Sequence, residues 1–339
     1  MLAWKSVRLT RTRRSRSNSN AKPHRRSYAA VSWSGSRTDT IAIGTKYRVH
    51  VKRDDLLGEA GTGGNKARKL AYFRRTLPET LQKEHYRRIV STGGNQSNAM
   101  LATAHLARDH GLQFDFFSKP LSPGARTEPS GNLAASLKLG MHLHEAQDVD
   151  AAIEEYLKSP EGAHSLYIPR GVSCQEAEEG LAELAQEIFE HFRSIAPNKS
   201  ELYVYLPSGT GTTAHYLHRN LLRLAKGTGV TPFTLGVSIA MRPQDLQASI
   251  EKTYPGELGY PLFVHPSKER YRFAEPNPHL KSMWCCLKRK GLEIDLIYAP
   301  VAWTVLFEQL PMINHNVAEV YYIHTGGLTG NESQLKRYP

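Results

Sequence analysis

Hydrophobic and polar residues along the chain follow two spacings that take turns. From Tyr47 to Asp55 apolar and polar positions begin by alternating one by one, which is typical of a half-buried strand. After a glycine-rich turn, Ala67, Leu70 and Phe73 are three residues apart, as on one face of a helix. The pattern predicts a strand near residue 50 and a helix that begins near residue 65.

The same alternation continues toward the end of the chain. Predicted strands cover residues 88–92, 113–119, 141–146, 202–206, 233–240, 294–300 and 318–324. Predicted helices cover residues 95–111, 132–140, 149–159, 174–193, 212–227, 280–291 and 302–310. Short links between strands and helices indicate an α/β protein with mainly parallel, helix-covered sheets, which we expect to form two domains with a cleft between them.

Positive charge is concentrated at the N-terminus. Residues 1–38 hold ten basic side chains and no acidic one, and subtracting these ten from the total of +12 leaves +2 for the other 301 residues. A nearly neutral folded part lacks the basic groove of a nucleic-acid-binding protein. The sequence therefore predicts no nucleic-acid partner.

The segment 1–40 is rich in Arg and Ser and almost free of acids, which is typical of an organellar transit peptide. We expect a disordered leader and a mitochondrial protein, with a plastid or the cytoplasm as alternatives. Three cysteines without a C-x-x-C pair indicate no disulfide framework. The sequence contains no run of eighteen apolar residues, so it predicts no membrane span. Two histidine pairs, at 142/144 and 215/218, lack a third ligand nearby in sequence, so we predict no metal site.

The stretch GTGGNKARKL, residues 61–70, fails the Walker A and G-x-G-x-x-G patterns. What remains is Lys66 at the predicted start of a helix. The positive end of a helix favours a neutral amine, which a lysine that forms a Schiff base needs. The alternative is an exposed lysine in a charged helix with Arg68 and Lys69.

Two further turns follow predicted strands. In STGGNQSNAM, residues 91–100, four polar side chains could bind a carboxylate or a ring hydroxyl, or Asn95 or Ser97 could simply cap the helix. In PSGTGTTAH, residues 207–215, backbone amides and threonines could hold one phosphate. A dinucleotide reading of this loop needs an acid at the end of the next strand, but Asp245 lies well past it. Tyr298 and the stretch 321–327 end two apparent strands, where α/β proteins place ligands.

Four stretches, in this order and at this spacing, resemble the pyridoxal-phosphate enzymes of the D-cysteine desulfhydrase and 1-aminocyclopropane-1-carboxylate deaminase family: KRDDLLG…GGNKARKL, TGGNQSNAMLATAHLA, SGTGTTA and YIHTGG. The resemblance covers roughly residues 45–330 and is weaker between 265 and 305. It implies the tryptophan-synthase-β-like fold, PLP fold type II, with two α/β subdomains in residues 41–339, the smaller one (roughly 90–200) inserted in the larger. It also implies a pyridoxal 5'-phosphate cofactor, a small amino-acid substrate and a homodimer.

By position, the resemblance makes Lys66 the lysine that binds the cofactor as a Schiff base and exchanges protons at Cα. Ser97, with Asn95 and Gln96, matches the site of the substrate carboxylate, and Tyr298 matches a tyrosine of the substrate pocket; Lys66, Ser97 and Tyr298 are the implied catalytic residues. The other implied cofactor contacts are Asn98 at the pyridine hydroxyl, Thr325, and the phosphate loop Ser208, Gly209, Thr210, Gly211, Thr212 and Thr213.

Three departures from the family pattern concern substrate choice. Thr325 favours a desulfhydrase, because deaminases usually have a leucine there. Ala299 fits neither group and leaves the pyridine nitrogen without a side-chain partner, which weakens the electron sink. An expected second pocket tyrosine is replaced by RYRFAEP, where Tyr271 is a candidate substitute.

The sequence thus favours a lyase that converts D-cysteine, or a related small amino acid, to pyruvate, ammonia and hydrogen sulfide. One alternative is a deaminase that opens 1-aminocyclopropane-1-carboxylate to 2-oxobutanoate and ammonia. From other classes, a nucleotide-dependent oxidoreductase would use the 209–214 glycine loop, and a protein without catalysis would only bind the cofactor.

Overall fold

The computed structural model describes residue 33 and the ranges 35–58 and 63–338. All the described residues belong to one compact unit, Val31–Pro339. The greater part of the predicted leader therefore lies outside the described residues. Its last residues do not, because strand β1 (Thr38–Ile43) begins at Thr38.

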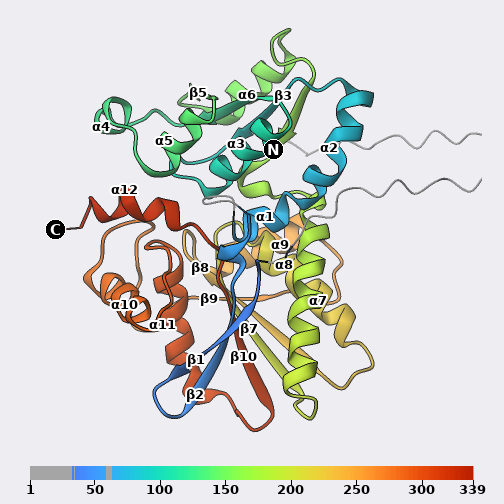
Figure 1. Cartoon of the computed structure of the whole chain (residues 1–339), viewed down its shortest axis with the longest axis vertical. Helices are drawn as coiled ribbons and strands as arrows, with labels where there is room; N and C mark the ends of the chain where they lie inside the picture. Colours follow the sequence, from blue (N-terminus) through green and yellow to red (C-terminus); the bar gives the residue numbers. More distant parts are fainter. Residues whose placement is uncertain (1–32, 34, 59–62, 339) are drawn as a thin grey trace, which may run out of the picture. The chain divides into compact units, whose positions relative to one another are not determined.

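The larger sheet has six strands in the order β1-β2-β10-β7-β8-β9 (Figure 1). After β1 these are β2 (Tyr47–Lys52), β7 (Glu201–Ser208), β8 (Thr231–Ser238), β9 (Leu262–Val264) and β10 (Ala318–Ile323). Only the pair β1 and β2 is antiparallel; the other four pairs are parallel. The carboxyl ends of five strands therefore meet at one edge, where α/β proteins place their ligands.

The smaller sheet has four parallel strands in the order β5-β4-β3-β6. They are β3 (Arg88–Thr92), β4 (Gln113–Ser118), β5 (Met141–Glu145) and β6 (Ser165–Ile168). All four lie in sequence between β2 and β7 of the larger sheet. The connection from β5 crosses back over β4 and β3 to reach β6, so the strand order reverses direction beside β3.

Twelve α-helices connect and cover the strands of the described chain. They are α1 (Asn65–Lys69), α2 (Ala71–Glu84), α3 (Asn98–Asp109), α4 (Pro123–Thr127), α5 (Gly131–Lys138), α6 (Val149–Lys158), α7 (Glu178–Ile195), α8 (Thr212–Ala225), α9 (Pro243–Thr253), α10 (Pro278–Arg289), α11 (Ala299–Gln309) and α12 (Asn331–Leu335).

Both sheets have hydrophobic cores on both faces. In the larger sheet, α7, α8 and α9 pack on one face and α10 and α11 on the other. In the smaller sheet, α2, α3 and α5 supply one core and α6 the other. Parallel strands covered on both faces are the architecture that the alternating pattern predicts. The predicted fold class is confirmed.

Several local predictions were wrong. Residues 294–298 are not a strand, because the Asp295 carboxylate accepts the backbone N–H groups of Ile297, Tyr298 and Ala299 and so turns the chain into α11. The short strands β6 and β9 are absent from the predicted set, since three or four residues carry too little alternation.

No described helix combines the length and the apolar character that crossing a membrane requires. His142 and His144 both lie near the buried Asp115 carboxylate, at 3.6 and 2.8 Å. Even so, the described residues contain no group of three or more potential ligands arranged to hold a metal ion.

Candidate active site

Lys66 lies in the short helix α1, and its neighbours there are not the exposed charges of the alternative prediction. Arg68 is fully buried and Lys69 is 2% exposed, while Lys66 is partly buried. The Lys66 amine donates a hydrogen bond to Asn65 Oδ1 at 2.9 Å. Burial lowers the pKa of this amine to about 8. The cause differs from the predicted one, because α1 is only one turn and a half long and burial, not the helix end, favours the neutral amine.

The predicted phosphate loop follows β7 and opens α8. Gly211 has a φ of 75°, and His215 N donates to its carbonyl as the first bond of the helix. The preceding amides of the first helical turn therefore have no intrahelical partner. With the positive end of a fourteen-residue helix behind them, they form a site suited to an anion.

Asn65 connects Lys66 to this loop. Its side-chain amide donates to Thr213 Oγ1 at 3.1 Å, while its oxygen accepts the Lys66 amine. Lys66 and Thr213 are 147 positions apart in sequence, yet one side chain bridges them. An aldehyde group bound at Lys66 and a phosphate bound at the loop could therefore belong to one small molecule.

Not every residue of the loop is free to bind. Thr212 is buried, and its hydroxyl lies 2.8 Å from Ser173 Oγ and 3.1 Å from Thr210 Oγ1. Ser208 is 3% exposed and its Oγ has no hydrogen-bond partner among the described residues, but it lies toward Gly236 of β8. Thr210 and Thr213 are therefore better placed than Thr212 to donate hydroxyl hydrogen bonds to a ligand.

Tyr298 and Thr325 border the same place. Tyr298 Cε1 lies 3.9 Å from the position of a Cβ on Gly209, and burial raises the pKa of the phenol to about 12. The Thr325 carbonyl accepts Asn65 N at 3.3 Å, so the end of β10 lies beside the start of α1. Both predicted residues thus stand next to elements that carry Lys66 or the phosphate loop.

The polar cluster after β3 divides into two roles. Ser97 caps α3, since its Oγ accepts the amides of Ala99 and Met100 at 3.2 and 3.3 Å. This is the capping role that the sequence left open, although the hydroxyl hydrogen is still available for a ligand. Asn98 Nδ2 lies only 2.6 Å from where a Cβ of Gly327 would be, so the cluster faces the end of β10.

The Gln96 side chain is fully used within the protein. Its Nε2 donates to Ser130 O at 3.0 Å, and its Oε1 accepts Asn132 N at 3.0 Å. The prediction that Gln96 binds a substrate carboxylate would require these bonds to break. The Asn95 side chain, by contrast, makes no hydrogen bond to any other described residue.

Two residues that sequence reasoning missed organise the site. Asn132, fully buried, donates to Asn98 Oδ1 at 2.7 Å and to Gln96 O at 2.9 Å. Lys69 donates to Gly171 O at 2.9 Å, and Gly171 packs against Thr210 of the phosphate loop. Burial and then the charge of Lys66 lower the pKa of Lys69 well below its usual value. Asn132 stands in none of the motifs, and Lys69 stands in one but was expected to be exposed, so only the contacts reveal these roles.

The structure also locates the family departures. Ala299 is 1% exposed in the first turn of α11 and offers no polar group. Tyr271 stacks on His279 at 6.1 Å and packs in the core beside α10 and α11. Instead, the ring of Phe273 meets Tyr298 edge-on at 5.7 Å. The aromatic neighbour of Tyr298 therefore lacks a hydroxyl.

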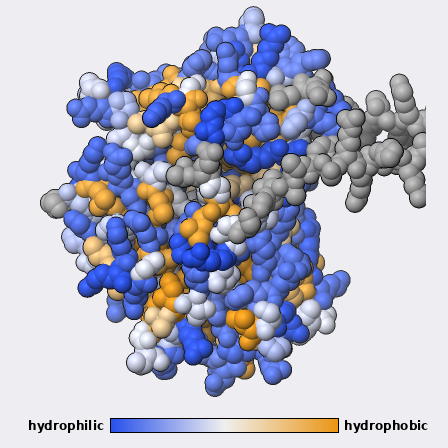
Figure 2. Space-filling view, viewed as in Figure 1, coloured by the Kyte–Doolittle hydropathy of each residue, from blue (hydrophilic) through white to orange (hydrophobic). Residues whose placement is uncertain are grey.

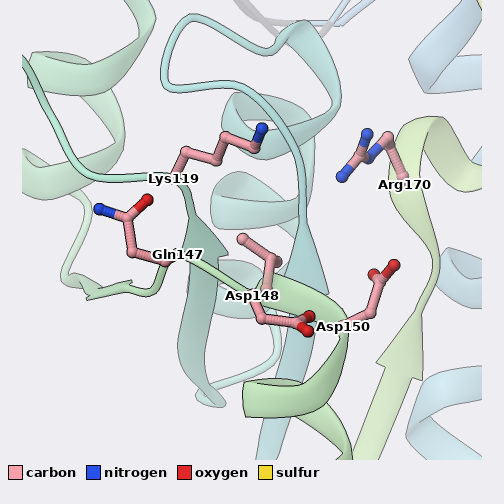
Figure 3. A pocket seen from close by; sticks show the side chains of 6 residues that line it. Lys119, Gln147, Asp148, Asp150 and Arg170 are labelled. Carbon is pink, nitrogen blue, oxygen red and sulfur yellow. The ribbon is translucent and has the colours of Figure 1, made fainter.

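A separate cavity of about 460 Å³ lies at the carboxyl edge of the smaller sheet (Figure 3). Its lining comes from the ends of β4, β5 and β6 and the start of α6: Lys119, Gln147, Asp148, Val149, Asp150 and Arg170. No predicted site residue is among them. This cavity therefore does not coincide with the region around Lys66.

No family model matches the chain. A Thermotoga maritima protein named "Putative 1-aminocyclopropane-1-carboxylate deaminase" is 26% identical over 313 residues, which are 86% of this chain and 92% of that protein. The crystal structure of an ACC deaminase homologue has a TM-score of 0.70 at 20% identity and covers 91% of this chain and 95% of that one. A fungal L-serine ammonia-lyase from Rhizomucor miehei has a TM-score of 0.60 at 15% identity, over 90% and 98% of the two chains.

These likenesses extend over most of both chains, and they agree with the two parallel, helix-covered sheets. The resemblance drawn from the four sequence motifs is confirmed by them. The chain therefore has the tryptophan-synthase-β-like fold, fold type II of the pyridoxal-phosphate enzymes, and resembles the D-cysteine desulfhydrase and 1-aminocyclopropane-1-carboxylate deaminase family.

Proposed function

We propose that this chain is a pyridoxal-phosphate-dependent lyase that takes D-cysteine, or a related small amino acid, and water to pyruvate, ammonia and hydrogen sulfide. One observation carries the proposal: Asn65 joins a partly buried amine, Lys66, to an anion-binding loop at the start of α8. This cofactor requires a lysine that binds its aldehyde and a loop that binds its phosphate.

The described residues fit the cofactor. The Lys66 amine would take its aldehyde carbon, and the amides after Gly209, with Thr210 and Thr213, would take its phosphate. Lys69, next to Thr210 through Gly171, would lie on the phosphate side, where the negative charge of a bound phosphate would favour its protonated form. Asn98 would face the ring hydroxyl, and Thr325, beside the start of α1, would be a further cofactor contact, whereas Ala299 offers no polar group to the ring nitrogen.

The bound cofactor would supply an electron sink for negative charge at the substrate Cα. The chain's own groups would do the rest. Lys66, whose free amine has its pKa lowered to about 8, accepts the Cα proton near neutral pH. Tyr298 keeps its proton, because burial raises the pKa of the phenol to about 12, and so it can donate a hydrogen bond to a leaving group. Asn95 and Ser97 would hold the substrate carboxylate.

Support for a β-thiolate leaving group comes from Thr325, which stands where deaminases of the family usually have leucine. The competing proposal is ring opening of 1-aminocyclopropane-1-carboxylate, with water, to 2-oxobutanoate and ammonia. It is favoured by the name of the Thermotoga maritima relative. The oxidoreductase alternative is weaker, because β8 ends at Ser238 and Asp245 is instead paired with Arg242 at the start of α9.

The deciding experiment is borohydride reduction of the purified protein with pyridoxal 5'-phosphate, followed by peptide mapping. The proposal requires a pyridoxyl group on Lys66, and its absence there would contradict it. Sulfide release from D-cysteine and 2-oxobutanoate release from 1-aminocyclopropane-1-carboxylate should then be assayed side by side. Labelling of Lys66 without either product would favour a protein that binds the cofactor without this catalysis, as Ala299 suggests.

A homodimer and mitochondrial import remain part of this proposal. Large apolar side chains that are exposed belong to many elements, and Figure 2 shows hydrophobic residues in separate areas of a mostly hydrophilic face. Light scattering of the purified chain would test the dimer. A fluorescent fusion to residues 1–40 would test the import.

A further inference from the structure

The residues just before β1 are bound to the back of the helix that carries Lys66. The indole of Trp33 lies under the Arg68 guanidinium, 4.2 Å from the ring centroid, and its N–H donates to Glu183 of α7. Ser36 Oγ donates to Asp54 Oδ1 at 2.7 Å and accepts from Arg68 Nη2 at 3.3 Å. We call residues 33 and 35–37 the strap.

The strap closes over a buried ion network. Arg68 bonds both oxygens of Asp54 and both oxygens of Glu187, at 2.7 to 3.2 Å. Lys52 adds a third bond to Glu187, to Oε2 at 2.6 Å. Two cations and two carboxylates balance, so each buried charge depends on all its partners being in place.

The fit of the strap is close. A Cβ on Gly35 would lie 2.5 Å from Leu56 O, and the Lys52 amine donates to Ser36 O at 3.1 Å. Arg53 N also donates to Arg37 O at 2.8 Å, which joins the strap to the end of β2. Water is thereby excluded from one side of the Arg68 network.

Arg68 and Lys66 belong to the same five-residue helix and face different surroundings. Such a short helix is not stable by itself and takes its position from what it contacts. On one side α1 is held through the ion pairs of its Arg68 and through close contact with Gly180 of α7. A Cβ on Gly180 would lie 2.2 Å from Arg68 O. On the other side Lys66 reaches Asn65 and the phosphate loop.

We infer that the strap is a positioning element for Lys66: by completing the Arg68 network behind α1, it fixes the helix so that the amine is held, shielded from water, against the phosphate loop. This inference rests on the proposed function for its importance but not for its test. Trp33 and Ser36 are positioning residues, since neither reaches the phosphate loop.

The test compares the full chain with Trp33→Ala, Trp33→Phe and Ser36→Ala, and with Phe233→Ala, which removes an aromatic ring at the far end of β8. Reductive methylation of Lys66 without added cofactor is followed by mass spectrometry from pH 6 to 10, together with hydrogen exchange of residues 65–70.

In Trp33→Ala we expect the midpoint of the labelling profile to move up by about one pH unit, so that labelling at pH 7 falls about tenfold, and exchange at 65–70 to increase. Trp33→Phe, which keeps a ring under Arg68, should retain most of the wild-type profile, and Phe233→Ala all of it.

An unchanged labelling profile and unchanged exchange in a folded Trp33→Ala protein would overturn the inference. Should Trp33→Ala fail to fold, Ser36→Ala, which removes a single hydroxyl, decides in the same way with a smaller shift. The two proposals are separable. If pyridoxal phosphate does not attach to Lys66 of the wild type, the proposed function fails, while the labelling without cofactor still decides on the strap.

Discussion

Two glycine turns lead into helices that carry predicted site residues, and they serve opposite purposes. At the first, Gly64 N donates to Asp54 O at 2.6 Å, and a Cβ on Gly64 would lie 1.9 Å from Thr325 O. At the second, a Cβ on Gly209 would meet only Tyr298 Cε1, at 3.9 Å. The first turn uses glycine to bring backbone against backbone, whereas the second leaves space at Gly209 and is closely packed only at Gly211, where a Cβ would lie 2.8 Å from the Ile250 side chain. Two similar glycine-rich sequences therefore form different turns. We call the one at Gly64 the closed turn and the one at Gly209 the open turn.

The largest expected effect is loss of the amine that the closed turn holds. Lys66→Ala should lower lyase activity roughly 10³-fold or more, because both the bond to the cofactor and the Cα base are lost. Sulfide and 2-oxobutanoate release measure this, with Lys226→Ala as an exposed lysine control. Activity within tenfold of the wild type would show that another residue is the base.

Adding a methyl group to each turn tests the comparison itself. Gly64→Ala should destabilise the protein by about 3 kcal/mol, because φ is +78° and the Cβ would collide with the Thr325 carbonyl. Gly209→Ala should change the free energy of unfolding by less than about 1 kcal/mol and instead weaken cofactor binding. Urea unfolding and a cofactor titration of both variants decide, and equal destabilisation would end the distinction between the turns.

The lowered pKa of Lys66 predicts a pH dependence of stability. Lysine titrates near 10.4 when unfolded and about 8 here, so between these values the unfolded chain binds more protons and stability rises with pH. The cost of the buried charge is fully present below about pH 8. Lys66→Met should therefore stabilise the cofactor-free protein at pH 7 by on the order of 1 to 3 kcal/mol and lose this advantage above pH 10. Lys226→Met is the control, and equal changes in both variants would refute the assignment.

The smallest effect concerns the open turn. Thr213→Val removes a hydroxyl that accepts from Asn65 and that faces the predicted phosphate. We expect about tenfold weaker cofactor binding with nearly unchanged stability, since one hydrogen bond to a charged group is lost. Thr228→Val, in the turn that follows α8, is the control. Fluorescence titration of the cofactor measures the ratio.

The sequence predicts what is local. Lys66, the loop after β7 and the cluster after β3 each follow a strand or open a helix, and the alternation of spacings is enough for the fold class. Contacts across long separations are not predictable in this way. Asn132 meets Gln96 and Asn98 over more than thirty positions, and Arg68 meets Glu187 over 119. The turn at Asp295 was predicted as a strand because its apolar residues follow one another in sequence. The Asp295 carboxylate bends the chain by accepting backbone amides, and the sequence pattern does not show such bonds.

The strap sets a limit on how the protein can be matured. If the basic leader is removed by a protease, the cut has to fall before Trp33, because the indole and the Ser36 hydroxyl belong to the folded unit. A cut a few residues later would leave Arg68 with an uncovered face and α1 without part of its support. The position of the cut would then determine whether the lysine of the mature protein is correctly placed.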